Sequence, residues 1–550
     1  MATAKASQDK KNQDESPISP DCKCTETGTK GPEPRLSRVN LFTLLSLWME
    51  LFPRNKPKNA EQSTGRKCTK QDGKNIQAKV SGLVVVQGRK VIGLHCSSAE
   101  LHVGQVAVIR HGPRLKGCDL YFSRKPCSTC MKMIVNADVN RVSYWPGDPE
   151  LSFLPLSDAA VVEHPAAVEH PAEFDAIAAE RLRSHRQLPV YVPLPHMMLR
   201  FAADTSAASS FLEYVAHSES RDARELFIEL QQRSLEDLTA TFFVTDELRH
   251  KYILRKIGLE SFCEEPYFSN LRKHMQDLIK VLASVASSVP DLQPDYGFYV
   301  NDQEEDPVPD QVEGPVPDQG EGPVPDQVEG PVPDQADDPA PGLSQDLPQD
   351  LSQDLPQDLS QDLPQDLSQD HSLELPPNLS QGLPQDVARH CMIQAQLLAY
   401  RTEDPKIGVG AVSWADGKSD RCDGTGHMYL VGCGYNGYPG GSAYSAFPWM
   451  GSDELNPRKK KYKYIIHAEQ NVLIFRSAEI KEDEKTMLFV TKCPCDDCVP
   501  LIVGAGIKQV YTTDRDSGKD KGDLSYLKFV QQQDVQKFIW QKTPQAEDLP

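Results

Sequence analysis

The sequence lacks a long apolar run. Its densest run, from Leu41 to Phe52, is about a dozen residues long, whereas a membrane-spanning helix needs roughly 20. Residues 1–38 are polar and charged without an apolar core, so we expect neither a signal peptide nor a membrane partner. Two interpretations of the apolar run stay open: a helix packed on a neighbouring domain, or a leucine-rich export or docking element.

The sequence also lacks an excess of positive charge. The net charge is −20, but residues 302–386 hold 22 of the 79 acidic residues and none of the 59 basic ones. The rest of the chain therefore carries 57 acidic against 59 basic residues. A balance near +2 does not indicate a basic nucleic-acid-binding face, so we do not expect nucleic acid as a partner.

Cysteines are sparse for a disulfide framework, at 14 in 550 residues, and several form Cys-x-x-Cys pairs. This pattern indicates metal ligands and reduced thiols, and hence a reducing compartment. We expect a cytoplasmic protein, with nuclear entry left open. The basic run Arg458–Lys463 is read first as a solvated loop, and alternatively as a phosphate contact or a signal for a nuclear-transport receptor.

Composition divides the chain into five segments. Residues 307–338 repeat units such as PVPDQVEG and residues 343–374 repeat LSQDLPQD, each with too few apolar side chains to offset chain entropy. The predicted segments are a disordered tail in which only Leu41–Phe52 orders (1–70), an α/β domain (71–150), a mainly helical extension (151–300), a disordered acidic repeat linker (301–386) and a second α/β domain (387–540).

The two α/β segments show the periodicities of strands and helices. In the first, GLVVV and KVIGLHC predict a hairpin with Gly88 in its turn. In the second, the pattern predicts helices at 387–400, 467–477 and 495–503, and strands at 408–414, 428–433, 487–491 and 509–513. Strands separated by helices indicate a mixed sheet between helical layers.

Two short motifs in the second segment carry chemistry. His467 opens a predicted helix, and Cys495 and Cys498 open another within Cys493–Cys498 (CPCDDC). Two thiolates and one imidazole give zinc three ligands and leave the fourth position for water, as in catalytic sites. A helix start favours the thiolate form. Cys493 is an alternative fourth ligand, which would make the site structural.

Glu469 stands two residues after His467, close enough to act on a water at the metal. It would take a proton from that water and pass it to a ring nitrogen and to leaving ammonia. A His-x-Glu followed by Pro-Cys-x-x-Cys is a known signature of zinc deaminases, so the motif is matched here rather than deduced.

Residues 387–515 resemble deoxycytidylate deaminases in four ordered motifs. These are Asp404-Pro405 before Gly408–Val412, the loop Gly434–Pro439 (GYNGYP), His467–Glu469 and Pro494–Cys498. The resemblance implies deamination of a free cytosine nucleotide or nucleoside, such as dCMP, dCTP, deoxycytidine or cytidine, to the uracil form. It also implies a three-layer αβα fold and a homo-oligomer.

The resemblance assigns Asn436 in that loop to the sugar or phosphate of the substrate. A glycine-rich turn with Asn436 in a left-handed conformation is the alternative.

The first α/β domain repeats this skeleton in degenerate form. His102 and the pair Cys127 and Cys130 form a second possible metal site, but Gly104 stands where the proton-carrying glutamate would be. Glu100 precedes the histidine and would point elsewhere. We therefore expect two cytidine-deaminase-like αβα domains, the first inactive. Its expected role is stability or assembly, with regulatory nucleotide binding as the alternative.

Two other classes of function stay open. Related deaminases act on single-stranded or flipped bases of polynucleotides, which would require a basic groove and stacking aromatics such as Trp449. A non-catalytic nucleotide-binding protein is the other class, although the intact Glu469 argues against it.

Overall fold

The computed structural model describes residues 35–53, 66–67, 77–151, 175, 177–179, 182, 193–292, 295–300, 382–402, 408–418, 424–439, 464–513 and 525–543. The acidic repeats, the basic run Arg458–Lys463 and Trp449 lie outside these residues. What the sequence predicts for those segments stays a prediction.

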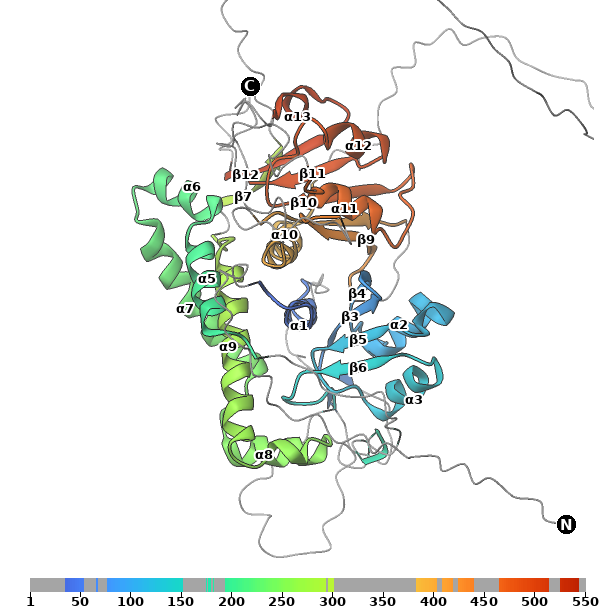
Figure 1. Cartoon of the computed structure of the whole chain (residues 1–550). Helices are drawn as coiled ribbons and strands as arrows, with labels where there is room; N and C mark the ends of the chain where they lie inside the picture. The colour runs from blue at the N-terminus through green and yellow to red at the C-terminus, as the bar shows by residue number, and fades with distance from the viewer. Residues whose placement is uncertain are drawn as a thin grey trace, which may run out of the picture. The chain divides into compact units, whose positions relative to one another are not determined.

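The first sheet has four strands in the order β4-β3-β5-β6 (Figure 1). Its members are β3 (Gly82–Gln87), β4 (Lys90–Cys96), β5 (Asp119–Phe122) and β6 (Arg141–Tyr144). β3 is antiparallel to β4 and β5, and β6 is parallel to β5. The valines of β3 are buried, and Gly88 makes the predicted turn at φ 61°.

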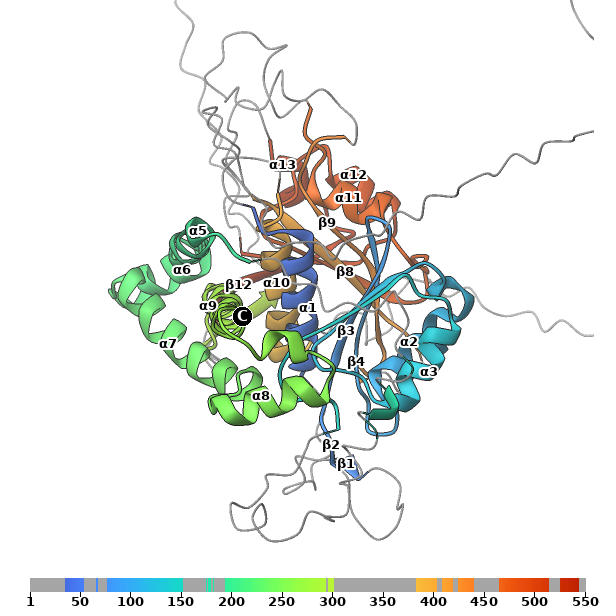
Figure 2. The same ribbon diagram turned by 60° about the horizontal axis from the view of Figure 1, so that its bottom comes forward.

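Helices cover both faces of the first sheet (Figures 1 and 2). α2 (Val103–His111) and α3 (Ser128–Asn136) lie on one face, and α1 (Arg38–Glu50) lies on the other against β3. α1 comes from the segment assigned to the tail, and its residues Asn40–Glu50 are all buried. The boundary predicted at residue 70 therefore assigned α1, the first helix of this fold, to the tail. Sequence composition does not reveal long-range packing.

The second sheet has six strands in the order β9-β8-β10-β11-β12-β7. They are β7 (Tyr296–Val300), β8 (Gly410–Asp416), β9 (Met428–Tyr435), β10 (Lys485–Val490), β11 (Gln509–Thr512) and β12 (Gln536–Lys542). β8 is antiparallel to β9 and β10, while β10, β11 and β12 are parallel. α10 (Gln385–Ala399) packs on β8, and α11 (Ala468–Ile474) packs on β9.

The edge strand β7 differs from the sequence prediction. It precedes the acidic repeats, in the segment assigned to a helical extension, yet it pairs antiparallel with β12 of the second sheet. Its Tyr296 and Phe298 are buried. A five-residue strand between a long helix and a polar repeat carries too little periodicity to be recognised from sequence.

The described residues 193–292 of the predicted extension are mainly helical. They contain α5 (His196–Ala207), α6 (Ser210–Glu219), α7 (Ala223–Phe242), α8 (Glu247–Lys256) and α9 (Tyr267–Ser287). Asp222 and Asp246 cap α7 and α8 by accepting backbone N–H groups of the first turn. The remaining described elements are β1 (Arg66–Lys67), β2 (Gln77–Ala78), η1 (Gly112–Leu115), η2 (Glu260–Phe262), α12 (Val499–Gly504) and α13 (Leu527–Gln531).

The order α1-β3-β4-α2-β5-α3-β6 recurs as α10-β8-β9-α11-β10-α12-β11 with the same strand directions. The chain thus contains two mixed α/β units of one plan, as expected. α1 and α10 pack against each other in the core.

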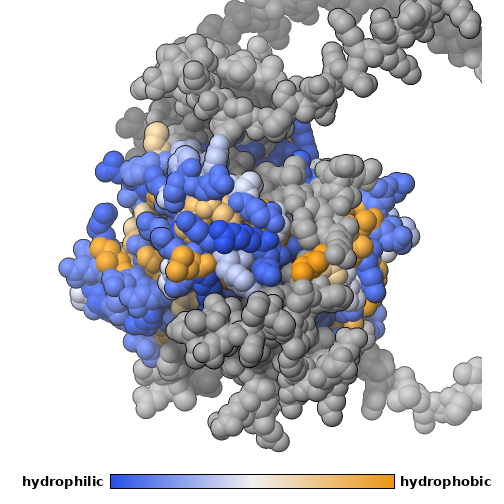
Figure 3. Space-filling model, turned by 90° about the horizontal axis from the view of Figure 1, so that it is seen from below, coloured by the Kyte–Doolittle hydropathy of each residue, from blue (hydrophilic) through white to orange (hydrophobic). Residues whose placement is uncertain are grey.

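Figure 3 shows the hydropathy of one face of the molecule. Where residues are coloured, the face drawn in Figure 3 is mainly hydrophilic, with apolar side chains in separate small groups. Within the described residues, no helix combines the length and apolarity that crossing a membrane requires.

Candidate metal and nucleotide site

His467 stands at the start of α11 as its N-cap residue, in an extended conformation. Its backbone N–H donates to Oε1 of Gln470 at 3.0 Å, which fixes the first turn of the helix. Ile466 forms an antiparallel bridge with Gly437. The GYNG loop is therefore fastened directly beside the histidine.

Cys495 and Cys498 converge on His467. Both sulfur atoms lie 3.3 Å from Nδ1 of the histidine. One ligand atom from each of the three residues lies within 4.8 Å of the others. Cys493 is also buried but lies outside this group.

The helix that follows the cysteines begins later than predicted. α12 starts at Val499, and Cys498 is its N-cap residue. Cys495 lies in the turn before the helix, where its carbonyl accepts from the N–H groups of Cys498 and Val499. The expected start at residue 495 is wrong because the chain first folds into that tight turn.

The donor set fits zinc. Two sulfurs and one imidazole nitrogen are the ligands zinc prefers, and three protein ligands leave one position open. The thiol of Cys498 donates to Cys495 and lowers the pKa of that cysteine to about 4, against the opposing effect of burial. The pair thus favours a thiolate at Cys495, and zinc binding would displace the remaining thiol proton.

Glu469 lies in the first turn of α11 and is 5% exposed. Glu469 lies near His467, Cys495 and Cys498 but outside this ligand group. A carboxylate in this position is placed to act on a molecule bound to the metal. Burial raises the pKa of Glu469 to about 7, while His467 lowers it. A carboxyl group of this kind exchanges protons near neutral pH.

Asn436 is buried in the GYNG loop, 6% exposed. Its Oδ1 accepts from the hydroxyl of Thr402 at 2.6 Å and from the backbone N–H of Val409 at 2.8 Å. The left-handed conformation considered from the sequence is wrong, because Asn436 does not have a positive φ. Its amide oxygen holds the start of β8 beside the loop, and contact with a substrate stays a prediction.

A cavity of about 450 Å³ opens beside this loop. Gly437, Tyr438 and Asn471 line it on the side of the second sheet. Four basic residues also line it: Arg38, Arg89, Lys90 and Arg401. Nε of Arg401 is buried and makes no hydrogen bond with the described residues. The sequence motifs did not predict this group of basic residues. Arg38, Arg89 and Lys90 precede the acidic repeats, whereas Arg401 follows them.

The first α/β unit places His102, Cys127 and Cys130 together, as the repeat predicts. His102 is the N-cap of α2 and its backbone N–H donates to Gln105, which matches the pair His467 and Gln470. Glu100 is exposed and lies outside the group.

A fourth residue, Glu150, joins that group, and sequence reasoning missed it. It lies 20 residues after Cys130, beyond β6, where no spacing rule points to it. The only local signal was a carboxylate following a proline-containing turn.

The sequence of this chain is similar to those of known proteins. The family described as the cytidine and deoxycytidylate deaminase zinc-binding region matches residues 386–513. The cytidine and dCMP deaminase domain-containing protein 1 of Danio rerio is 48% identical over 519 residues, which cover 94% of this chain and 92% of that protein. The deoxycytidylate deaminase of Homo sapiens is 34% identical over 140 residues, covering 25% of this chain and 71% of that protein.

Among solved structures, the apo form of dCMP deaminase from the cyanophage S-TIM5 is 25% identical, with a TM-score of 0.20, and covers 28% of this chain and 99% of that one. On the length and identity of the match with the Danio rerio protein, this chain belongs to the cytidine and deoxycytidylate deaminase family.

Proposed function

We propose that the second α/β unit catalyses the hydrolytic deamination of a free cytosine nucleotide, dCMP or dCTP, to the uracil form with release of ammonia. The observation that carries this proposal is the convergence of His467, Cys495 and Cys498 beside the buried carboxylate of Glu469. Family membership supports the same reaction.

His467, Cys495 and Cys498 would hold the zinc ion. When bound, zinc supplies Lewis acidity that activates a water for attack on C4 of cytosine. Glu469 accepts a proton from the attacking water and delivers it to N3 of the ring. The same carboxylate then takes the second proton of that water from the C4 hydroxyl and delivers it to the exocyclic amine. The C4–N bond breaks, the uracil carbonyl forms and ammonia leaves. Burial of Glu469 keeps this proton transfer away from bulk solvent.

The basic cavity beside Gly437 supports a phosphorylated substrate over a nucleoside. Arg38, Arg89, Lys90 and Arg401 are among the residues that line it, and guanidinium and ammonium groups are suited to phosphate oxygens. We therefore place the phosphate group of the substrate in this cavity.

Turnover of the zinc-loaded full-length chain tests the reaction. Product formation is followed with dCMP, dCTP, deoxycytidine, cytidine and a single-stranded oligonucleotide. We expect a free nucleotide to be converted, and Glu469→Gln to lower kcat by about 10²- to 10⁴-fold while metal content is retained. The matched control is Glu100→Gln, which should leave kcat unchanged. Glu100 is exposed and lies two residues before His102.

Three results would contradict the proposal: conversion of the oligonucleotide alone, no conversion by zinc-loaded protein, or full activity of Glu469→Gln. For the phosphate, Arg401→Met should raise KM for the nucleotides and leave kcat/KM for cytidine unchanged. Arg233→Met, an exposed arginine on α7, is the control. Equal effects on nucleotide and nucleoside would place the phosphate elsewhere.

A further inference from the structure

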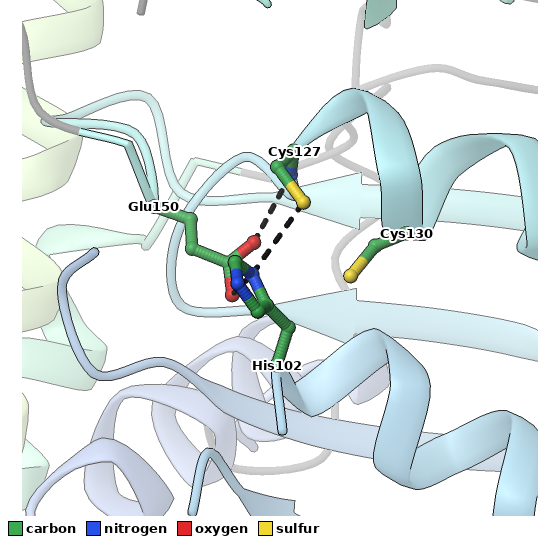
Figure 4. Close-up of side chains that lie close together, drawn as sticks. All are labelled: His102, Cys127, Cys130 and Glu150. Carbon is green, nitrogen blue, oxygen red and sulfur yellow. Dashed lines mark hydrogen bonds and ion pairs between the residues drawn. The ribbon is translucent and has the colours of Figure 1, made fainter. Parts of the chain in front are cut away.

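Glu150 completes a cluster of four buried metal-binding groups in the first α/β unit (Figure 4). Its Oε1 lies 3.0 Å from Nδ1 of His102, and that nitrogen lies 3.4 Å from Sγ of Cys127. All four ligand atoms, including Sγ of Cys130, lie within 4.8 Å of one another. Glu150 is 1% exposed and Cys130 fully buried.

The carboxylate of this unit has a different position from that of Glu469. Glu469 lies on the helix that His467 starts and remains outside its ligand group. Glu150 follows β6 and lies inside the ligand group of its unit. At Gly104, the counterpart of Glu469, a Cβ atom would lie 2.7 Å from Cβ of Cys130. The first unit therefore has no room for a glutamate at the proton-carrying position.

The backbone around Glu150 holds this arrangement. Its N–H donates to the carbonyl of Lys125 at 3.0 Å, and its carbonyl accepts from the N–H of Lys79 at 2.7 Å. Its Oε2 accepts from the N–H of Cys127 at 3.0 Å. One carboxylate oxygen is thus engaged by the backbone, and the other is directed at Nδ1 of His102, as a monodentate metal ligand requires.

The distances and charges fit a tetrahedral zinc ion. Ligand atoms about 2.0–2.3 Å from zinc lie roughly 3.3–3.8 Å apart at tetrahedral angles. Nδ1 of His102 lies 3.0 Å from Glu150 and 3.4 Å from Cys127, and the other pairs lie within 4.8 Å. As thiolates, Cys127 and Cys130 together with the carboxylate of Glu150 would bring three negative charges into a buried site, and a divalent cation offsets most of that charge.

One cavity lined by Cys127 among the described residues is too small for a nucleotide. Its volume is about 10 Å³. Pro149, Asp175 and Ala179 help to line it. Asp175 also accepts from the N–H of Ser128, so this carboxylate is held at the start of α3.

We propose that His102, Cys127, Cys130 and Glu150 form a closed four-ligand zinc site, in which Glu150 occupies the position that water takes in a catalytic deaminase site. The site is structural. It fastens the segment after β6 to the N-terminal ends of α2 and α3. No deamination takes place there, because no ligand position remains for a water.

Metal content and the Co²⁺ spectrum of the full-length chain test this proposal. The triple substitution His467→Ala, Cys495→Ser, Cys498→Ser removes the second site, and we expect one metal ion per chain to remain. Loaded with Co²⁺, this variant should show thiolate charge-transfer bands and intense four-coordinate visible bands. Azide should leave the spectrum unchanged, and adding Glu150→Ala should create an azide-dependent change.

Absence of metal in the triple variant, or an azide response already present with Glu150 intact, would overturn the proposal. So would deamination by the triple variant that Glu150→Gln abolishes, because Glu150 would then carry protons. These outcomes are independent of activity at Glu469, so failure of the proposed function is distinguishable.

Single substitutions in the otherwise intact chain provide a second test. Two metal ions per chain are expected in the wild type and in Glu150→His, since imidazole is also a zinc ligand. In Glu150→Ala, a chelator should remove one of the two ions at least about 10-fold more readily than in the wild type. Loss of a residue that only hydrogen-bonds to a metal ligand already has an effect of this size, so loss of a ligand should have at least as much. The exposed Glu100→Ala is the control. Equal retention in Glu150→Ala and Glu100→Ala would show that Glu150 is not a ligand.

Discussion

Trp48 of α1 donates its indole N–H to the backbone carbonyl of His390 in α10 at 3.0 Å. Its ring also stacks on the imidazole of the same residue, with centroids 4.8 Å apart. One residue of the predicted tail thus joins the first helices of the two α/β units. The apolar run in which it lies is therefore a core element of both.

Trp48→Ala should destabilise the protein by about 3–5 kcal/mol, because it removes a buried indole from the contact between α1 and α10. Trp48→Phe keeps most of the apolar surface and should cost less. Urea unfolding measures both. Leu248→Ala, 80% exposed on α8, is the control and should stay within about 0.5 kcal/mol of wild type. A similar small effect of Trp48→Ala would mean that α1 is not part of the core.

Arg124→Met should be strongly destabilising at neutral pH. Nε of Arg124 donates to Oε1 of the buried Glu50 at 3.0 Å, and removing the guanidinium leaves a buried carboxylate with the Ser123 hydroxyl but without a positive charge beside it. Such losses amount to about 3–5 kcal/mol. The double variant Glu50→Gln, Arg124→Met should recover much of that loss in a double-mutant cycle. Strict additivity of the two single effects would argue against a coupled pair.

Gly104→Ala should lower the unfolding temperature, because the new methyl group would lie 2.7 Å from Cβ of Cys130 and 3.0 Å from its sulfur. Overpacking of this kind costs about 1–3 kcal/mol. Gly504→Ala in α12 is the matched control, since a Cβ there meets nothing within 4 Å. A methyl group in a helix with open space should be neutral or stabilising. The prediction is wrong if the two variants behave alike.

Acid should destabilise the protein through buried neutral histidines. His95 and His111 share an Nε2–Nε2 hydrogen bond of 2.8 Å. Burial, with a smaller contribution from Arg110, lowers the pKa of each to about 3. In the unfolded chain histidine has a pKa near 6.5. The unfolded state therefore takes up protons that the folded state does not, and stability falls as the pH drops below about 6.5 towards 3.

The comparison of wild type with His111→Gln isolates this effect, because all other titrating groups are common to both. Each such histidine contributes a slope of about 1.4 kcal/mol per pH unit well below pH 6.5. The variant should lose about that much of the slope of unfolding free energy between pH 6 and 5. Identical slopes would mean that His111 is protonated in the folded protein.

Much of the candidate site could be predicted from the sequence because its chemistry is local. His467 and Glu469 are two residues apart at a helix start, and Cys495 and Cys498 are three apart at a turn. Such spacings mark the candidate residues in the sequence, whereas the contact of His467 with Cys495 and Cys498 depends on the fold. The repeated strand and helix patterns likewise indicated two α/β units, since periodicity reports burial on one face.

What only the tertiary structure decided depends on contacts between residues far apart in the chain. Glu150 enters the group of His102 because backbone hydrogen bonds to Lys79 and Lys125 hold the segment after β6 beside the cysteines. β7 reaches the second sheet from the other side of the acidic repeats. The sequence by itself determined the zinc-binding motifs and the α/β plan. The fold determined which helix completes the first unit, which strand closes the second sheet and which carboxylate joins the first metal cluster, because these depend on long-range packing that no local pattern records.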